Sequence, residues 1–221
     1  MNRSKDTEVK RILRTDGAAL RVREADGVPG RTITGYAILF NTPSEPLWRD
    51  EDSEAREVIS PGAITKEVLD GCDIKFTMYH DRQLLLGRSC RGAGTLEYFV
   101  DERGVGFNLE LPDSPNGNEA LELVRRGDIT GCSFAFTTRY WDSDFVERTA
   151  KAVNGVTQIT YTVKTVTGVY DFTLAADPAY PDTSVEAREL ADGLRSPAPA
   201  DSAEVGRQVS EMRREAARRP I

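Results

Sequence analysis

Histidine is almost absent from this sequence, which has a single one, His80, among 221 residues. A zinc site built from several histidines is therefore excluded. Imidazole is the side chain that most readily exchanges a proton near neutral pH. If this protein uses imidazole as a general base, His80 must be the residue that does so.

Cysteine is also scarce, and the three cysteines, Cys72, Cys90 and Cys132, are widely spaced along the chain. An odd number without paired spacing is typical neither of a disulfide framework nor of a thiolate metal site. We therefore expect a reducing compartment, no metal ion and no cofactor.

Positive charge is not in excess, because the formal net charge is −7 at pH 7. Without a basic field, sequence-independent binding to nucleic acid is not expected. No apolar run approaches the roughly 18 residues that a membrane-spanning helix needs. The first six residues, which begin Met1-Asn2-Arg3, also lack the apolar stretch of a signal peptide. We expect no nucleic-acid partner, no membrane partner and a cytoplasmic location.

The length of the chain suits one folded domain with a tail at each end. We expect an N-terminal arm over residues 1–29, because its first fifteen residues are polar and mixed in charge, a folded domain over 30–185, and a C-terminal tail over 186–221. The tail contains Ser196-Pro197-Ala198-Pro199, a composition typical of flexible linkers, followed by a charged segment that favours helix.

Most of the central domain is predicted to be β-structure. Segments rich in β-branched and aromatic residues, bounded by Gly, Pro, Asp and Asn, predict short strands. These segments are 33–40, 74–79, 95–100, 105–111, 129–140, 158–163 and 169–175. Their spacing is typical of hairpins and shows no regular alternation of strand and helix. It favours a mainly β (α+β) fold, an antiparallel β-barrel with peripheral helices.

Two short helices and one long loop are expected around these strands. Ser60 and Pro61 suit the cap and first position of a helix that would end at Gly71. Residues 118–126 have apolar side chains at helical spacing and are followed by Gly127, which suits a helix end. Residues 41–55, rich in Pro, Ser and acidic side chains, are expected to form a loop.

His80 and Ser133 are the leading candidates for catalytic residues. His80 follows a predicted strand and begins a polar loop, where a rigid scaffold can present a reactive side chain. Ser133 lies in Gly131-Cys132-Ser133 at the start of another apolar strand. Neighbouring strand residues face opposite sides, so only one of Cys132 and Ser133 can face His80. We interpret Cys132 as a buried thiol and Ser133 as the candidate nucleophile. Taken singly, each residue is also compatible with a purely structural role.

A third catalytic group would be a carboxylate that orients the imidazole. Asp171 lies in a strand otherwise filled with aromatic and aliphatic residues, where an unpaired charge would be costly. Asp171 therefore either has a partner or faces solvent on the polar side of its strand. Asp81 and Asp177, in adjacent loops, remain alternatives.

The order of these motifs resembles that of the prohead maturation proteases of tailed bacteriophages, which are related to the herpesvirus assemblins. The resemblance extends over about residues 30–185. The matching motifs are Gly35-Tyr36-Ala37, Ile59-Ser60-Pro61-Gly62-Ala63, Tyr79-His80-Asp81, Leu86-Gly87-Arg88, Gly104-Val105-Gly106-Phe107, Leu123 to Ile129, Gly131-Cys132-Ser133-Phe134-Ala135-Phe136, and Tyr170-Asp171-Phe172-Thr173-Leu174 with Asp177-Pro178-Ala179.

This resemblance implies a serine endopeptidase with an assemblin-like barrel, in which Ser133, His80 and Asp171 match the catalytic positions. The chain departs from the family pattern at Cys132, at Ala135 and in having aspartate rather than glutamate at the third position. The oxyanion donors cannot be identified from the sequence, and Arg88 or backbone N–H groups near it are candidates.

The implied substrates are the scaffold and the scaffolding segment of the major capsid protein. The implied location is the interior of the immature capsid, or prohead, in the host cytoplasm. The resemblance to the assemblins also implies a homodimer or homo-oligomer, and the exposed tail suggests self-cleavage. Two alternatives remain open. One is an inactive capsid-assembly module of the same fold, and the other is a β-barrel binding module, which predicts that His80 and Ser133 lie far apart.

Overall fold

The structure is a computed structural model that describes residues 9–15, 20–25 and 28–175. This part of the chain is mainly β, with two short helices, α1 (Lys66–Asp70) and α2 (Pro115–Arg126). The strands are β1 (Val9–Thr15), β2 (Arg21–Ala25), β3 (Val28–Leu39), β4 (Trp48–Arg49), β5 (Ser53–Ile59), β6 (Asp73–Met78), β7 (Asp81–Cys90), β8 (Ala93–Gly94), β9 (Leu96–Val100), β10 (Gly104–Glu110), β11 (Gly131–Thr138), β12 (Val146–Val153), β13 (Val156–Val163) and β14 (Gly168–Ala175).

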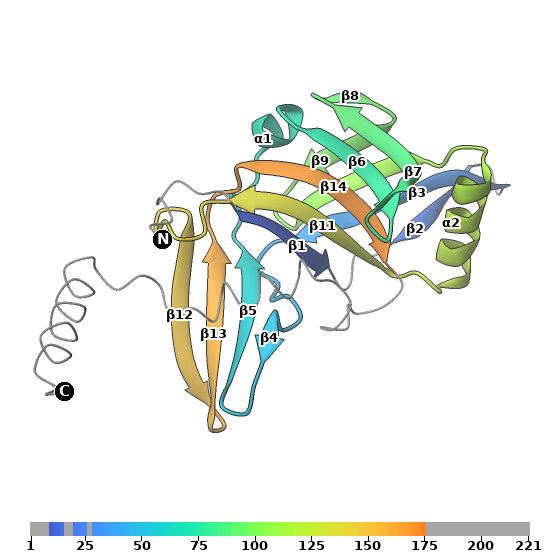
Figure 1. Ribbon diagram of the computed structural model, residues 1–221. Helices are drawn as coiled ribbons and strands as arrows, with labels where there is room; N and C mark the ends of the chain where they lie inside the picture. The colour runs from blue at the N-terminus through green and yellow to red at the C-terminus, as the bar shows by residue number, and fades with distance from the viewer. Residues whose placement is uncertain (1–8, 16–19, 26–27, 176–221) are drawn as a thin grey trace, which may run out of the picture. The chain divides into compact units, whose positions relative to one another are not determined.

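The strands form three sheets (Figure 1). A six-stranded sheet has the order β1-β11-β14-β6-β7-β8. A second sheet, here called the β3 sheet, has the order β2-β3-β10-β9, and a third, the β13 sheet, has the order β12-β13-β5-β4. The six-stranded sheet carries all three candidate catalytic residues, because His80, Ser133 and Asp171 belong to it or to its turns.

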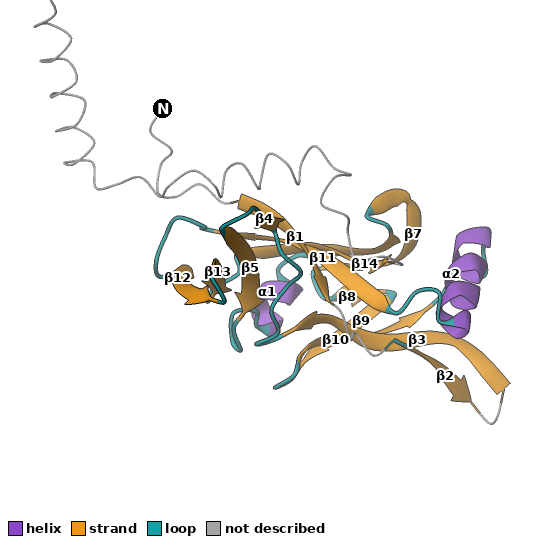
Figure 2. Ribbon diagram, turned by 90° about the horizontal axis from the view of Figure 1, so that it is seen from below, coloured by secondary structure: helices purple, strands orange, loops and turns teal. Residues whose placement is uncertain are grey.

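The main core lies between the six-stranded sheet and the β3 sheet, which face each other in Figure 2. Phe76 on β6 packs on Phe107 of β10, with ring centroids 4.7 Å apart, and Phe172 on β14 is 6.5 Å from Phe76. All three rings are fully buried. Side chains alternate along a strand, so the residues next to Phe76 on β6 and next to Phe172 on β14 project from the opposite, outer face of the six-stranded sheet.

Two strand pairs are parallel, so the expectation of a wholly antiparallel sheet is wrong. β14 pairs with β6 and β13 pairs with β5 in parallel registers. Each of these pairs joins strands far apart in sequence, which hairpin-like spacing cannot reveal. Hydrogen bonding among the described strands leaves three open sheets. The expected closed, assemblin-like barrel is therefore not confirmed.

The helix expected at Ser60 begins later. Pro61 and Gly62 instead form a turn, in which the Ala63 N–H donates to the Ser60 carbonyl at 3.1 Å. Gly62 has φ +81°, which suits the third position of a proline-containing turn and cannot continue a helix. Helix α1 is capped instead by Thr65.

Helix α2 agrees with its prediction at the C-terminal end. Gly127 takes a left-handed conformation, with φ +77°, and closes the helix as expected. The N-terminal end lies earlier than predicted, because Ser114 caps the helix and Pro115 occupies its first turn. The predicted hairpin of β9 and β10 is also present.

Two segments expected to be irregular contain strands. β1, in the expected N-terminal arm, pairs with β11, and β2 pairs with β3. The expected loop over 41–55 contains β4 and the first residues of β5. β1 and β5 have partners that are remote in sequence, β11 and β13, and such tertiary context often overrides local preference. β2 and β4 instead pair with the strands that follow them, β3 and β5. The predicted tail over 186–221 lies outside the described residues.

Candidate active site

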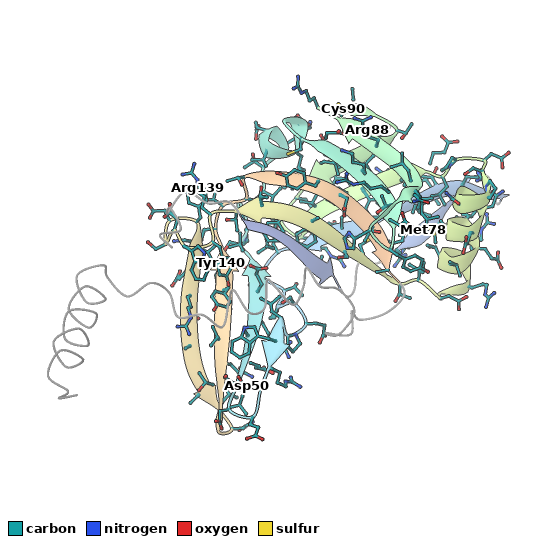
Figure 3. All side chains as sticks on the ribbon, viewed as in Figure 1. Asp50, Met78, Arg88, Cys90, Arg139 and Tyr140 are labelled. Atoms are coloured by element: carbon teal, nitrogen blue, oxygen red, sulfur yellow. The ribbon has the colours of Figure 1, made fainter. Side chains whose placement is uncertain are left out.

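His80 lies at the tip of the β6–β7 hairpin. Met78 on β6 pairs with Asp81 on β7, so Tyr79 and His80 form a two-residue connection. Both have left-handed backbones, with φ values of 55° and 58°. Positive φ at both central residues is the pattern of a type I′ turn, which is usually built from Asn and Gly. Figure 3 labels Met78 at this end of the hairpin.

Strand register aligns the other site residues in a row. Ser133 on β11 is the partner of Thr173 on β14, and Thr173 is the partner of Thr77 on β6. Partners in neighbouring strands share one face of the sheet. Asp171 lies two residues before Thr173 and therefore projects from the same face. The intervening Phe172 is buried in the core, so this row lies on the outer face.

The three residues predicted as a catalytic set are brought together by this arrangement. His80 Nε2 lies 2.8 Å from Ser133 Oγ, and His80 Nδ1 lies 2.8 Å from Asp171 Oδ1. The side chains of His80 and Asp171 are 24% and 16% exposed, so the imidazole is reachable from solvent. Ser133 is more deeply buried. A binding module with His80 and Ser133 far apart, one of the alternatives, is contradicted by these distances.

A β-bulge in β14 lies next to Asp171. Asp171 pairs with Ala135, whereas Val169 pairs with Phe136, so Tyr170 is an extra residue on β14. Bulges change the direction of the strand and re-aim nearby side chains, and they are common beside active sites. This bulge adjoins the residue whose carboxylate contacts His80.

Cys132 behaves as predicted. Its side chain is fully buried, on the opposite side of β11 from Ser133. Burial in an apolar environment strongly raises the pKa of the Cys132 thiol. Because the thiolate is the nucleophilic form of cysteine, Cys132 is not a competing nucleophile.

Of the two alternative carboxylates, only Asp81 lies in the described part of the chain, and its hydrogen bond is not to the imidazole. Asp81 is exposed, and its Oδ1 accepts a hydrogen bond from the Gln83 N–H at 2.8 Å. Asp177 lies outside the described residues.

Arg88, suggested as a source of oxyanion donors, lies toward the other end of β7 from His80 (Figure 3). Its guanidinium donates to both oxygens of Asp73, at 2.6 and 2.8 Å. These bonds from Arg88, together with one from Lys75, hold the pKa of Asp73 well below its usual value. The Arg88 side chain is therefore held in an ion pair with Asp73 and is not directed at an oxyanion that would form beside Ser133.

Thr173 is a site residue that sequence reasoning did not identify. Its Oγ1 accepts a hydrogen bond from the His80 N–H at 2.9 Å. The only available signal was a hydroxyl residue two positions after Asp171 in an apolar strand, and many buried threonines share that pattern.

Within residues 9–15, 20–25 and 28–175, no three His, Cys, Asp or Glu side chains cluster in a way that could hold a metal ion. No helix in the same ranges combines the length and apolar character needed to cross a membrane.

Comparisons with known proteins concern the family of the chain. A solved structure, the capsid assembly protease gp21 of bacteriophage T4, is similar over 75% of this chain and 99% of that chain, with 10% identity and a TM-score of 0.39. No curated protein matches the sequence. The family model described as caudovirus prohead serine protease matches residues 18–195, which is most of the chain. The chain therefore belongs to the caudovirus prohead serine protease family, as the sequence motifs predicted.

Proposed function

We propose that Ser133, His80 and Asp171 form the catalytic triad of this serine peptidase, an endopeptidase of the phage prohead. The observation that carries the proposal is the double contact of one imidazole, with Ser133 Oγ on Nε2 and Asp171 Oδ1 on Nδ1, both at 2.8 Å. His80 is the only histidine, so no second imidazole competes for the role.

The first step is acylation. An Nδ1–H that donates to Asp171 leaves the Nε2 lone pair directed at the Ser133 hydroxyl. Nε2 takes the hydroxyl proton as Ser133 Oγ attacks the carbonyl carbon of the scissile peptide bond. The tetrahedral intermediate collapses when the imidazolium protonates the amine nitrogen, which leaves with the C-terminal product.

The second step is deacylation by water. Neutral His80 accepts a proton from a water molecule that attacks the Ser133 ester, and then returns that proton to Ser133 Oγ. Asp171 stays ionised throughout, where it holds the imidazole orientation and stabilises the imidazolium. The side chain of Asp171 is short, and the bulge at Tyr170 supports its reach to Nδ1.

The substrates that we propose are the scaffold and the scaffolding segment of the major capsid protein, cleaved inside the immature capsid. The family description supports a role in the prohead. We also propose self-cleavage within the tail over 186–221, because segments of Ser/Pro/Ala composition are easily cleaved by proteases. A homodimer or homo-oligomer is the expected assembly, and the assemblin-like barrel remains an expectation for the fold.

The alternative of an inactive assembly module predicts no hydrolysis at all. It has less support, because such a module does not need a nucleophile, an imidazole and a carboxylate within hydrogen-bond distance. The two proposals therefore differ in one measurable product, the cleaved chain.

Intact-mass spectrometry separates these possibilities. Wild type and Ser133→Ala are each incubated alone and with the cognate capsid and scaffold proteins. Ser89→Ala is the matched control, because Ser89 is a buried serine of the same sheet, on β7. We expect fragments with wild type and Ser89→Ala, and a loss of about 10⁴-fold or more in rate with Ser133→Ala.

The same experiment tests self-cleavage, because wild type alone should lose C-terminal mass while Ser133→Ala stays intact. Substantial cleavage by Ser133→Ala would refute the nucleophile assignment. An absence of fragments with every variant, under conditions in which the shell assembles, would favour the inactive module.

A further inference from the structure

Thr173 makes an unusually complete set of hydrogen bonds beneath the candidate triad. Its side chain is fully buried. Its Oγ1 accepts from the His80 N–H at 2.9 Å and from Thr77 Oγ1 at 3.0 Å, and donates to the Thr77 carbonyl at 3.0 Å. A threonine hydroxyl has one donor and two acceptor positions. All three positions are used here, and all are used on the strand and turn that carry His80.

The turn that Thr173 holds is one that the local sequence disfavours. Tyr79 and His80 both take left-handed backbones, with φ values of 55° and 58°. Residues with a Cβ pay a steric cost in this region, and such conformations persist only where surrounding contacts over-determine them. Two hydrogen bonds from the turn to β14 hold this conformation. One runs from the Tyr79 N–H to the Leu174 carbonyl at 3.1 Å, and the other from the His80 N–H to Thr173 Oγ1.

We propose that Thr173 is a positioning residue for catalysis, which fixes the backbone of His80 so that its imidazole reaches Ser133 and Asp171. The inference rests on the proposed function. β14 then holds His80 at two points, because Asp171 binds the imidazole and Thr173 binds the backbone N–H. The hydrogen bonds of the Thr173 hydroxyl go to Thr77 and to the backbone of His80, so the proposed role of Thr173 is exerted through His80.

The physical reason is that catalysis tolerates only small displacements of the catalytic groups. A shift of about 1 Å in a catalytic group can cost about 10²-fold in rate. Without the Thr173 hydroxyl, the His80 N–H and the buried Thr77 hydroxyl each lose a hydrogen-bond partner. The turn is then expected to shift, because another conformation could give the His80 N–H and the Thr77 hydroxyl new partners and relieve the strain of the left-handed backbone.

Three substitutions test this role. Thr173→Val keeps the shape of the side chain and removes its hydroxyl, whereas Thr173→Ser keeps the hydroxyl. Thr138→Val is the matched control, because Thr138 is a fully buried threonine on β11 whose Oγ1 donates to the Thr165 carbonyl at 2.7 Å. It reports what the loss of any buried threonine hydroxyl does to this fold.

The expected kinetic result is a split between kcat and KM. Thr173→Val should lower kcat by about 10- to 100-fold and leave KM within about twofold, because substrate contacts are unchanged. Thr173→Ser should stay within about threefold of wild type, and Thr138→Val should keep wild-type kcat although it loses a comparable hydrogen bond.

Nuclear magnetic resonance of the single histidine gives a readout that does not depend on activity. With only His80 in the chain, the imidazole signals need no assignment. In Thr173→Val, these signals should shift or broaden relative to those of wild type. In Thr138→Val they should match wild type. If Thr173→Val proves unfolded, Thr77→Val removes one bond to the same hydroxyl and should produce a smaller change of the same kind.

The proposal is overturned if Thr173→Val keeps wild-type kcat, or if its imidazole signals are those of wild type. It is also overturned if Thr138→Val loses kcat to the same extent, because the effect would then be one of general stability. Failure of the proposed function looks different. In that case Ser133→Ala would remain active, whereas the response of the His80 signals to Thr173→Val would persist.

Discussion

His80 and Ser133 are 53 residues apart in the sequence, yet His80 Nε2 and Ser133 Oγ are 2.8 Å apart. Neither residue lies at the end of a long flexible loop. His80 occupies a two-residue turn and Ser133 lies within β11, in the interior of the six-stranded sheet. Their contact is therefore set by the sheet itself, through the row of partners on β11, β14 and β6.

Replacing Asp171 with Asn should lower kcat sharply without unfolding the protein. The NH2 group of asparagine can donate to Nδ1, which places the imidazole proton on Nε2 and removes the base that faces Ser133. Losses of about 10²–10⁴-fold in kcat are therefore expected. Peptide hydrolysis rates and thermal unfolding curves check this. Asp81→Asn is the control, since Asp81 lies on the same hairpin but is exposed and does not contact the ring. Unfolding of Asp171→Asn would instead identify a structural carboxylate.

The two cysteines at opposite extremes of burial should react with very different rates. Cys90 is exposed, whereas Cys132 is buried and burial raises the pKa of its thiol. Because alkylation needs an accessible thiolate, iodoacetamide should label Cys90 in the native protein and reach Cys132 only in denaturant. Peptide mass mapping at successive times checks the order. Rapid native labelling of Cys132 would show that β11 opens readily.

The ion pairs of Asp73 should make stability depend on pH in the acid range. Hydrogen bonds from Arg88 and Lys75 lower the folded pKa of Asp73 below its ordinary value of 3.8. The contribution of Asp73 to the free energy of unfolding is therefore fully present above about pH 4 to 5 and is lost as the pH falls toward the folded pKa. Urea midpoints between pH 2 and 6 should fall more steeply for wild type than for Asp73→Asn.

The size of this effect should be small, because surface ion pairs contribute little. Activity at neutral pH should not change in Asp73→Asn, since Asp73 lies at the end of the hairpin away from His80. Identical acid slopes for wild type and variant would show that the ion pair contributes nothing.

Gly87 on β7 should not tolerate a methyl group. A Cβ at this position would collide with Leu109 Cδ1 and lie 3.2 Å from Thr95 Oγ1. Leu109 is fully buried in the core, so it has little room to move. Gly87→Ala should therefore destabilise the fold by about 1–3 kcal/mol, the usual cost of overpacking. Denaturant unfolding measures the change, with Ala93→Gly on the exposed β8 as a control that should alter stability by less. A stable Gly87→Ala would show that β7 and β10 can separate without cost.

Local sequence was sufficient for several elements because their signals are short-range. The β9–β10 hairpin has its turn residues between two β-rich segments, and α2 ends at Gly127, as predicted. Ser60-Pro61 was misread because a capping serine and a first-turn proline also begin a turn, and the left-handed Gly62 decides between the two. The turn at Tyr79 and His80 gave no sequence signal, because neither residue is one of those that usually form type I′ turns.

By itself, the sequence determined the family, most of the strand segments and the short set of side chains capable of chemistry. A single histidine and a Gly-Cys-Ser strand were sufficient to nominate His80 and Ser133. Only the tertiary structure decided which carboxylate contacts the imidazole and that Thr173 holds the backbone of His80. The reason is the parallel pairing of β14 with β6, which joins residues nearly a hundred positions apart. Parallel strands are joined by long connections, so local residue patterns do not show which distant strands will pair.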